Sequence, residues 1–412
     1  MAAIALPALS LFGSTSLLPS CTASSTHDAM TTDEVYWKSI RDQYTLDDSV
    51  INLNNGGVSP QPKVVQDAHI ARYRKSNLAP SYFMWRTIDE EREPLRNRLA
   101  AMVHCHPEEL AINRNTTEGL NTIIFGLDLE KDDEVVLSTY DYPHMLNAWR
   151  QRELRDGIKL NYVHLNQPEE NADKIVAQYR AAITARTKVV HITHVINWTG
   201  QVVPVKEITA MAHELGCQVI VDAAHSFAQF PLDIADINCD YLATSLHKWL
   251  CAPFGTGILF IKKERIGKVW PLLSSYESMK DNIRKFETLG TRSFGAEMAI
   301  HDALDFHEQI GQDRKTARLR YLKKYWTEKV KDLPKIRFYT SMKDQFSGGM
   351  ATVGMEGWDA EEILGHLFTT QKLHATPVQH ESVNGVRISP HVYTSLTELD
   401  LLVAELTAMA KR

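Results

Sequence analysis

Two short runs of strand-forming residues, each followed by polar side chains, constrain the fold of this chain more than any other feature. The runs are Val219–Val221 and Tyr241–Thr244. The polar residues that follow them are Asp222, His225, Ser245, His247 and Lys248. Short apolar runs of this kind predict buried strands of a parallel sheet. Ligands of open parallel sheets bind just beyond the carboxyl ends of the strands, so we expect these side chains to share one crevice.

An acid and a lysine at neighbouring strand ends are what a pyridoxal phosphate enzyme needs. The cofactor's aldehyde forms a Schiff base with a lysine amine, and its pyridine nitrogen stays protonated beside a carboxylate. Taken alone, an Asp after a strand is most often a turn or cap residue, and a lone Lys is most often a solvated surface charge. The joint pattern Asp222-x-x-His225 and Ser245-x-His247-Lys248 therefore carries the prediction.

This segment resembles the class V aminotransferases of pyridoxal phosphate fold type I, most closely their isopenicillin N epimerase-like branch. The resemblance implies that Lys248 is the Schiff-base lysine, that Asp222 pairs with the pyridinium, and that His225 lies beside the ring's phenolic oxygen. It also implies an α/β fold. A large domain would hold a mostly parallel seven-stranded sheet between helices, and a smaller α+β domain would follow at the C-terminus.

The order of predicted elements agrees with that architecture. Strands at 134–139, 189–195 and 219–221 alternate with helices such as 205–216, a cadence typical of right-handed crossovers in a parallel sheet. A longer, largely helical stretch follows at 297–330. With 412 residues the chain is too long for one hydrophobic core. We expect a signal-like or disordered segment at 1–32, a segment packing with the small domain and active site at 33–60, the large cofactor-binding domain at 61–285 and the small domain at 286–412.

The resemblance assigns further residues to the cofactor. Tyr142 would stack on the ring, Asn197 would hydrogen-bond the phenolic oxygen, and Thr291 would reach the phosphate of the neighbouring subunit in a homodimer. Thr116 and Thr117 open an apolar helix whose N-terminus would hold the phosphate, although simple N-capping explains them equally well. The predicted cofactor contacts are Thr116, Thr117, Tyr142, Asn197, Asp222, His225, Ser245, His247, Lys248 and Thr291.

Three residues are assigned to the substrate by the same resemblance, namely Asn54, Gly57 and Arg387. The planar guanidinium of Arg387 suits a carboxylate held by two parallel hydrogen bonds. Without the resemblance, Arg387 is better explained as a surface charge at a strand edge, and Asn54–Gly57 as a plain turn. Tyr142 has a competing interpretation as a core tyrosine.

The resemblance identifies the cofactor better than the reaction. Lys248 would take the Cα proton of an amino acid or peptide-like amine. Returning the proton to the opposite face gives epimerisation, returning it to the cofactor gives transamination, and expelling a β-substituent gives a C–S lyase. We take an epimerase or aminotransferase as the leading interpretation and the β-lyase as the alternative. A non-enzymatic alternative is an exported binding protein on a degenerate fold.

Several other functions are disfavoured by composition and spacing. Cysteine desulfurases need a nucleophilic cysteine shortly before the substrate-binding arginine, and no cysteine follows Cys251. The net charge of −6 argues against a nucleic-acid partner. Five cysteines without Cys-x-x-Cys spacing indicate neither a disulfide framework nor a zinc site. The pairs His104-x-His106 and His191-x-x-His194 lack an acidic ligand at helical spacing, so we expect no metal.

The N-terminus differs from the rest in composition. Ala2–Pro19 carries no charge and is rich in Ala, Leu and Ser, which is typical of an export signal. Leu18-Pro19-Ser20-Cys21 resembles a lipoprotein cleavage box. We therefore expect an exported protein, periplasmic or lipid-anchored at Cys21, with a disordered tail on a cytoplasmic protein as the alternative.

Overall fold

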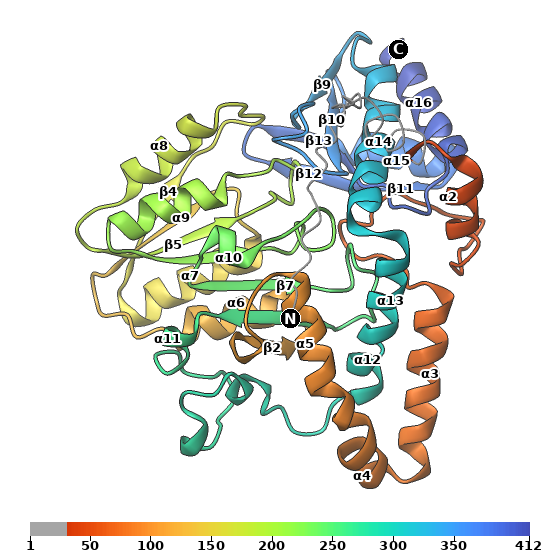
Figure 1. Ribbon diagram of the computed structural model, residues 1–412. Coiled ribbons are helices and arrows are strands. Elements are labelled where there is room, and N and C mark those ends of the chain that lie inside the picture. The colour runs from red at the N-terminus through yellow and green to blue at the C-terminus, as the bar shows by residue number, and fades with distance from the viewer. Residues whose placement is uncertain (1–30) are drawn as a thin grey trace, which may run out of the picture.

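The computed structural model describes residues 31–412. Residues 1–30, which include Cys21 and most of the predicted export segment, lie outside the described residues. Within residues 31–412, no helix combines the length and the apolar character needed to cross a bilayer. A large sheet with its helices lies beside a smaller sheet that is covered by the C-terminal helices (Figure 1).

The large sheet has seven strands, and all but one of them run in the same direction. The exception is β8, which is antiparallel to both of its neighbours, β2 and β7. In spatial order the strands are β2 (Leu110–Asn113), β8 (Gly257–Ile261), β7 (Tyr241–Ser245), β6 (Gln218–Asp222), β5 (Thr187–Thr193), β3 (Glu134–Ser138) and β4 (Lys159–Val163). The predicted seven-stranded, mostly parallel sheet is confirmed.

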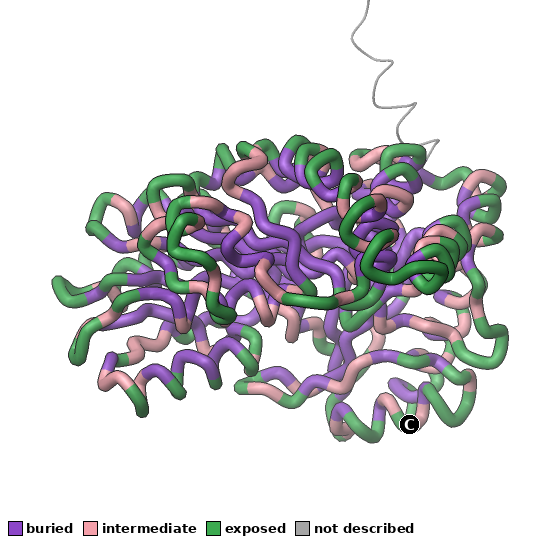
Figure 2. The backbone as a smooth tube through the Cα atoms, turned by 90° about the horizontal axis from the view of Figure 1, so that it is seen from below, coloured by how far each residue is buried: buried purple, intermediate pink, exposed green. Residues whose placement is uncertain are grey.

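Both faces of the inner strands of this sheet are buried, which explains why these strands are rich in apolar residues, whereas the edge strand β4 is largely half-buried (Figure 2). In β6, the side chains of Val219 and Val221 enter one apolar cluster and Ile220 enters another on the opposite face. The helices that supply these two clusters or connect the strands are α5 (Arg92–Met102), α6 (Thr116–Gly126), α7 (Pro143–Asp156), α8 (Ala172–Ala182), α9 (Val205–Glu214), α10 (Ile234–Ile237) and α11 (Lys263–Ile266).

The stretch predicted to be helical at 297–330 consists of three helices. They are α12 (Phe294–Met298), α13 (Ile300–Ile310) and α14 (Gln312–Val330). Gly311 separates the last two with φ +86° and ψ 136°, a backbone conformation that side chains exclude and glycine adopts readily. The other helices are α2 (Glu34–Arg41), α3 (Lys63–Leu78), α4 (Pro80–Phe83), α15 (Ala360–Gln371) and α16 (Leu396–Ala410).

The smaller sheet is antiparallel and has the order β12 (Thr376–His380), β13 (Val383–Ile388), β10 (Ala351–Met355) and β9 (Ile336–Phe338). The N-terminal segment is joined to this region by a parallel pair, β1 (Ile51–Asn52) with β11 (Leu373–His374). A further bridge links Asn54 to Ser389. Asn54 is therefore held close to the end of β13, although 335 residues of chain separate it from Ser389.

An internal ion pair fixes β2, the strand that leads into α6. Arg96 of α5 donates to Glu287 at 2.6 Å and to the Leu110 carbonyl at 2.6 Å. Glu287 also accepts from the Ile112 N–H at 2.6 Å. The Arg96 side chain is fully buried and that of Glu287 is 6% exposed, so each charge depends on the other.

We expect Arg96→Met to destabilise the protein by about 3–5 kcal/mol, because it leaves the buried Glu287 carboxylate without the cation that hydrogen-bonds it. Arg98→Met on the same helix is the matched control. Arg98 pairs with Asp305 and Glu308, whose side chains are mostly exposed, so its loss is expected to cost less than about 1 kcal/mol. Urea unfolding measures both variants. Equal losses of stability would contradict this account of β2.

Candidate active site

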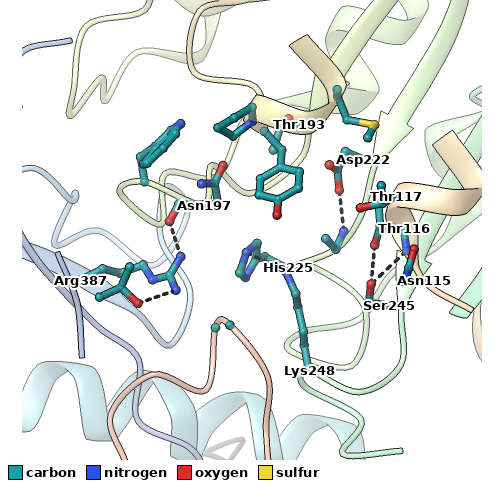
Figure 3. Close-up of a pocket in the computed structure, with 18 of the residues that line it drawn as sticks. Asn115, Thr116, Thr117, Thr193, Asn197, Asp222, His225, Ser245, Lys248 and Arg387 are labelled. Atoms are coloured by element: carbon teal, nitrogen blue, oxygen red, sulfur yellow. Dashed lines mark hydrogen bonds between the residues drawn. The ribbon is translucent and has the colours of Figure 1, made fainter. Parts of the chain in front are cut away.

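A cavity of about 420 Å³ lies at the carboxyl ends of β5, β6 and β7, where the two sheets meet. It is lined by every predicted site residue except Thr291. Asp222 and the Thr116–Ser245 pair lie on one side, Asn197 and Arg387 on the other, with Lys248 and His225 between them (Figure 3).

At one end of the cavity, the N-terminus of α6 meets the end of β7. The hydroxyl of Ser245 accepts from the Thr116 N–H at 3.0 Å and lies 2.8 Å from the Thr116 hydroxyl. The Asn115 side chain caps the helix by accepting from the Glu118 N–H at 2.8 Å. A Cβ on Gly119 would lie 2.7 Å from the Ala243 Cβ, so only glycine lets α6 approach β7 this closely. Hydroxyls and helix N–H groups together suit an anion such as phosphate.

Asp222 ends β6 and is buried. Within the described residues its carboxylate accepts a hydrogen bond from the Ala224 N–H at 2.9 Å. Burial raises the pKa of Asp222, and the Ala224 N–H and the charge of Lys248 oppose that rise. A buried carboxylate with so little compensation suits a cationic ligand group, such as a protonated ring nitrogen.

Lys248 follows β7 and places its Nζ 3.2 Å from Nε2 of His225. Burial lowers the pKa of Lys248 to about 8, against the opposing effect of Asp222, so much of the amine is neutral and nucleophilic near that pH. Burial and the charges of Lys248 and Arg387 hold the pKa of His225 well below its ordinary value. His225 is therefore a neutral imidazole that can exchange hydrogen bonds with a ligand oxygen.

Arg387 lies in β13, the strand between β12 and β10, and is only 6% exposed. Its guanidinium donates to the Asn197 carbonyl at 2.7 Å, to Asn54 Oδ1 at 2.9 Å and to Thr376 Oγ1 at 3.1 Å. Among the described residues no carboxylate pairs with it, and burial lowers its pKa to about 10. The interpretation as an exposed strand-edge charge is wrong, because the N-terminal segment and β12 cover this side chain.

Several buried polar atoms of the cavity have no partner within the described structure. They are Asn197 Oδ1, His225 Nδ1, His247 Nδ1, Trp198 Nε1 and Arg387 Nε. Native interiors rarely leave such atoms unpaired, so they indicate where a polar ligand would bind. An anion at α6, a cationic ring nitrogen at Asp222 and a carbonyl within reach of Lys248 together match pyridoxal phosphate, with Arg387 left for a substrate carboxylate.

Thr291 lies elsewhere, in a surface hollow shared with Trp85, Thr288 and Arg292. A role at the active site would require a neighbouring subunit, so its assignment stays a prediction.

The remaining histidine pairs do not form a metal site. His104 pairs with Asp233 at 2.7 Å on the surface, whereas His191 is buried and accepts from Trp149 Nε1 at 3.3 Å. Among residues 31–412, no group of three or more potential ligands converges on one point.

Several residues that we did not predict also line the cavity, and two of them, Thr376 and Trp198, make contacts that shape it. Thr376 donates to Asn54 and accepts from Arg387, which fixes both substrate-side groups. Trp198 lines the cavity and stacks on His380, with ring centroids 4.4 Å apart and planes 8° apart. Trp198 directly follows Asn197, and Thr376 lies 11 positions before Arg387. Their nearness in sequence to these two predicted site residues was the signal that could have identified them.

Comparison with known proteins places this geometry in a family. A model described as "Aminotransferase class-V" matches residues 51–402. Isopenicillin N epimerase of Streptomyces clavuligerus is 29% identical over 391 residues, covering 90% of this chain and 98% of the relative. Cysteine desulfurase of Haloferax volcanii is 27% identical, covering 87% of this chain and 89% of the relative.

Solved structures with the same fold include a cysteine desulfurase from Thermococcus onnurineus NA1, with a TM-score of 0.79, 23% identity and coverage of 90% of this chain and 98% of that one. A cystine C–S lyase in complex with its product cysteine persulfide gives a TM-score of 0.76 at 22% identity, covering 86% of this chain and 97% of that one. At these identities the structures establish the fold, which is pyridoxal phosphate fold type I.

In cofactor-free protein, we expect the Lys248 amine to become reactive towards an amine-directed label with a midpoint near pH 8. Asp222→Asn should move the midpoint to lower pH, because the carboxylate favours the ammonium form. Arg387→Leu should move it to higher pH, because the guanidinium disfavours that form. Mass spectrometry of the labelled Lys248 peptide measures all three. A common midpoint at the value of an ordinary exposed lysine would contradict the electrostatics of the site.

Proposed function

The chain belongs to the class-V aminotransferase family, and from that premise we propose that it is a pyridoxal phosphate enzyme that epimerises the α-carbon of an amino acid or peptide-like amine. The observation that carries the proposal is that one cavity holds both a buried amine, on Lys248, and a buried guanidinium, on Arg387. Lys248 is buried beside His225, and the uncompensated Arg387 faces the same space. The epimerase relatives match nearly the whole chain, which supports this reaction among those the family performs.

The cofactor, when bound, supplies an aldehyde that links to amines and a ring that draws electrons away from the substrate's Cα. Thr116, Thr117, Ser245 and His247 would hold its phosphate, and Asp222 would hold its pyridine nitrogen protonated. Asn197, on the side away from α6, and His225, at the centre of the cavity, each have a buried polar atom without a partner among the described residues. They would bind the phenolic oxygen, while Tyr142 would cover the ring.

Arg387 would bind the α-carboxylate of the substrate. Its guanidinium is already oriented by Asn197, Asn54 and Thr376, so little freedom is lost when the substrate binds. A carboxylate would also supply the negative charge that this buried cation lacks. Gly56 and Gly57 let the backbone of the N-terminal segment approach this end of the cavity closely.

Epimerisation needs one group to remove the Cα proton and another to return a proton from the other side. We assign the first role to the Nζ of Lys248 and the second to the hydroxyl of Tyr142. In the order of the sheet, Lys248 follows β7 and Tyr142 follows β3, so they reach the cavity from opposite sides of Asp222 on β6. Burial raises the pKa of Tyr142, which keeps its hydroxyl protonated as a donor.

A C–S lyase is the second candidate, because several relatives are named as cysteine desulfurases. The described cysteines are Cys105, Cys217, Cys239 and Cys251, and none of them lines the cavity. A mechanism that carries sulfur on a cysteine therefore has no support among residues 31–412. Direct expulsion of a β-substituent needs no cysteine and keeps the same Lys248 proton step.

A homodimer completes the proposal. Thr291 would contact the phosphate bound in the neighbouring subunit. Large apolar side chains are exposed around this part of the molecule, including Tyr82, Trp85, Trp270, Leu272, Leu273 and Tyr276. Exposed apolar patches of this kind mark protein interfaces. Trp85, from the short helical segment Met84–Ile88 that follows α4, lines the same hollow as Thr291.

Incubating the cofactor-loaded protein with a panel of amino acids in deuterium oxide tests the reaction. We expect deuterium at Cα together with inversion of configuration, without release of a keto acid or a sulfur product. Tyr142→Phe should retain exchange with retention of configuration while inversion falls by about 10²-fold or more. Keto-acid release would identify an aminotransferase, sulfur release would identify a lyase, and either result would contradict the epimerase proposal.

Subunit complementation tests the dimer. Lys248→Ala subunits lack the amine and Thr291→Val subunits lack the phosphate contact, so each homodimer should be impaired. In mixed dimers, one site would combine an intact Lys248 with an intact Thr291 from the other subunit, and cofactor binding at that site should recover. We expect light scattering to show twice the 46.7 kDa chain mass. A monomer, or no recovery on mixing, would contradict this assignment.

A further inference from the structure

A second buried lysine, Lys315, contacts the backbone of the residue that follows Lys248. Lys315 of α14 is 2% exposed, and its Nζ donates to the carbonyl of Trp249, the residue that follows Lys248. Among the described residues, the other hydrogen-bonding neighbour of this amine is Nδ1 of His307, at 3.4 Å. Lys315 does not line the cavity, so it does not contact the ligand that Lys248 would bind.

The environment of Lys315 makes its retention costly. No carboxylate within residues 31–412 pairs with it, and burial lowers its pKa to about 8, with Cys251 acting in the opposite direction. Burying a cation without a counter-ion costs free energy of folding. A role for its hydrogen bonds that an apolar side chain could not fill explains why a lysine occupies this position. The titratable groups that face it from the surrounding elements are His307 of α13, Cys251 of the Lys248 turn and His391 between β13 and α16.

The carbonyl that Lys315 binds belongs to a strained turn. The Cys251 N–H donates to the Lys248 carbonyl at 3.3 Å, and Cys251 has φ +61°, a left-handed conformation that is unfavourable for a residue with a Cβ. Such a conformation persists only where surrounding contacts enforce it. Lys315 supplies one of these contacts, and Nε2 of His391 lies 3.4 Å from the same Trp249 carbonyl.

The contacts continue to the substrate side of the cavity. The His391 ring stacks on Trp249 at 5.7 Å and on Tyr393 at 5.8 Å. The Tyr393 hydroxyl donates to Asn55 Oδ1 at 2.6 Å, and Asn55 is the neighbour of Asn54, which orients Arg387. The turn that carries Lys248 and the segment that orients Arg387 thus share one buried set of contacts.

We propose that Lys315 is a positioning residue, whose hydrogen bond to the Trp249 carbonyl holds the strained turn so that Lys248 points into the cavity. The inference rests on the proposed role of Lys248 as the cofactor-linked amine. Under this proposal, the orientation and burial of the Lys248 amine depend on a residue that lies outside the cavity and far from Lys248 in sequence.

Lys315→Met tests the proposal, with Lys323→Met as the matched control. Lys323 lies on the same helix, is fully buried, donates to Ser347 and also has a pKa lowered by burial to about 8. Both variants remove a buried amine, but only Lys315 contacts the Lys248 turn. Lys315→Gln keeps a hydrogen-bond donor without the charge and serves as the rescue variant, and as the working variant if Lys315→Met does not fold.

Two readouts are expected to change in Lys315→Met and not in Lys323→Met. In cofactor-free protein, amide hydrogen exchange in residues 249–252 should accelerate about tenfold or more, because the turn loses an anchoring bond. The labelling midpoint of Lys248 should rise towards that of an ordinary lysine, because a displaced amine is less buried. Lys315→Gln should return both values close to those of the unsubstituted protein.

Unchanged exchange in residues 249–252 would overturn the proposal, and so would faster exchange with an unchanged Lys248 midpoint. Equal changes in the Lys323→Met control would also overturn it, since they would indicate a general loss of stability. A protein that forms no link between Lys248 and the cofactor would refute the proposed function instead. In that event the exchange and labelling measurements, which need no cofactor, still decide whether Lys315 positions the turn.

Discussion

The active site depends on two buried ionisable groups that form no ion pair with any of the described residues. Asp222 receives one backbone hydrogen bond, and Arg387 receives no carboxylate. Each is held in place by the fold, Asp222 at the end of a fully buried strand and Arg387 between two strands of the smaller sheet. Burying an ion is unfavourable unless a partner is nearby, so this arrangement is best explained by ligands that bring the missing charges. A cationic ring nitrogen meets the first need and a substrate carboxylate meets the second.

Much of this site could be predicted from local sequence. Asp222 and Lys248 each follow a strand-forming run, and the rule that ligands bind at the carboxyl ends of parallel strands brings them together. The strand–helix cadence likewise predicts the parallel sheet. Arg387 was harder, because its burial depends on the N-terminal segment, which lies 333 positions away at Asn54, and on the pairing of β13 with its neighbour β12. Local pattern alone favoured an exposed arginine there, and only the family resemblance corrected that interpretation.

Other features could not be predicted because they arise from tertiary packing. The break between α13 and α14 depends on the backbone conformation at Gly311, whereas the charged and apolar pattern continues across it. Thr376 gives no sign in the sequence that its hydroxyl joins Asn54 to Arg387. Lys315 resembles any other lysine of a long amphipathic helix until the fold places it against Trp249. The contacts of Lys315 with Trp249 and of Thr376 with Asn54 join residues 66 and 322 positions apart in the chain.

Borohydride reduction of the protein after incubation with pyridoxal phosphate, followed by peptide mapping, tests the central claim most directly. The account predicts a single stable cofactor adduct on the peptide that contains Lys248, and its loss together with cofactor absorbance in Lys248→Ala. In Asp222→Ala the adduct should form with much weaker retention of the cofactor. Modification scattered over surface lysines, with the Lys248 peptide unlabelled, would contradict the account.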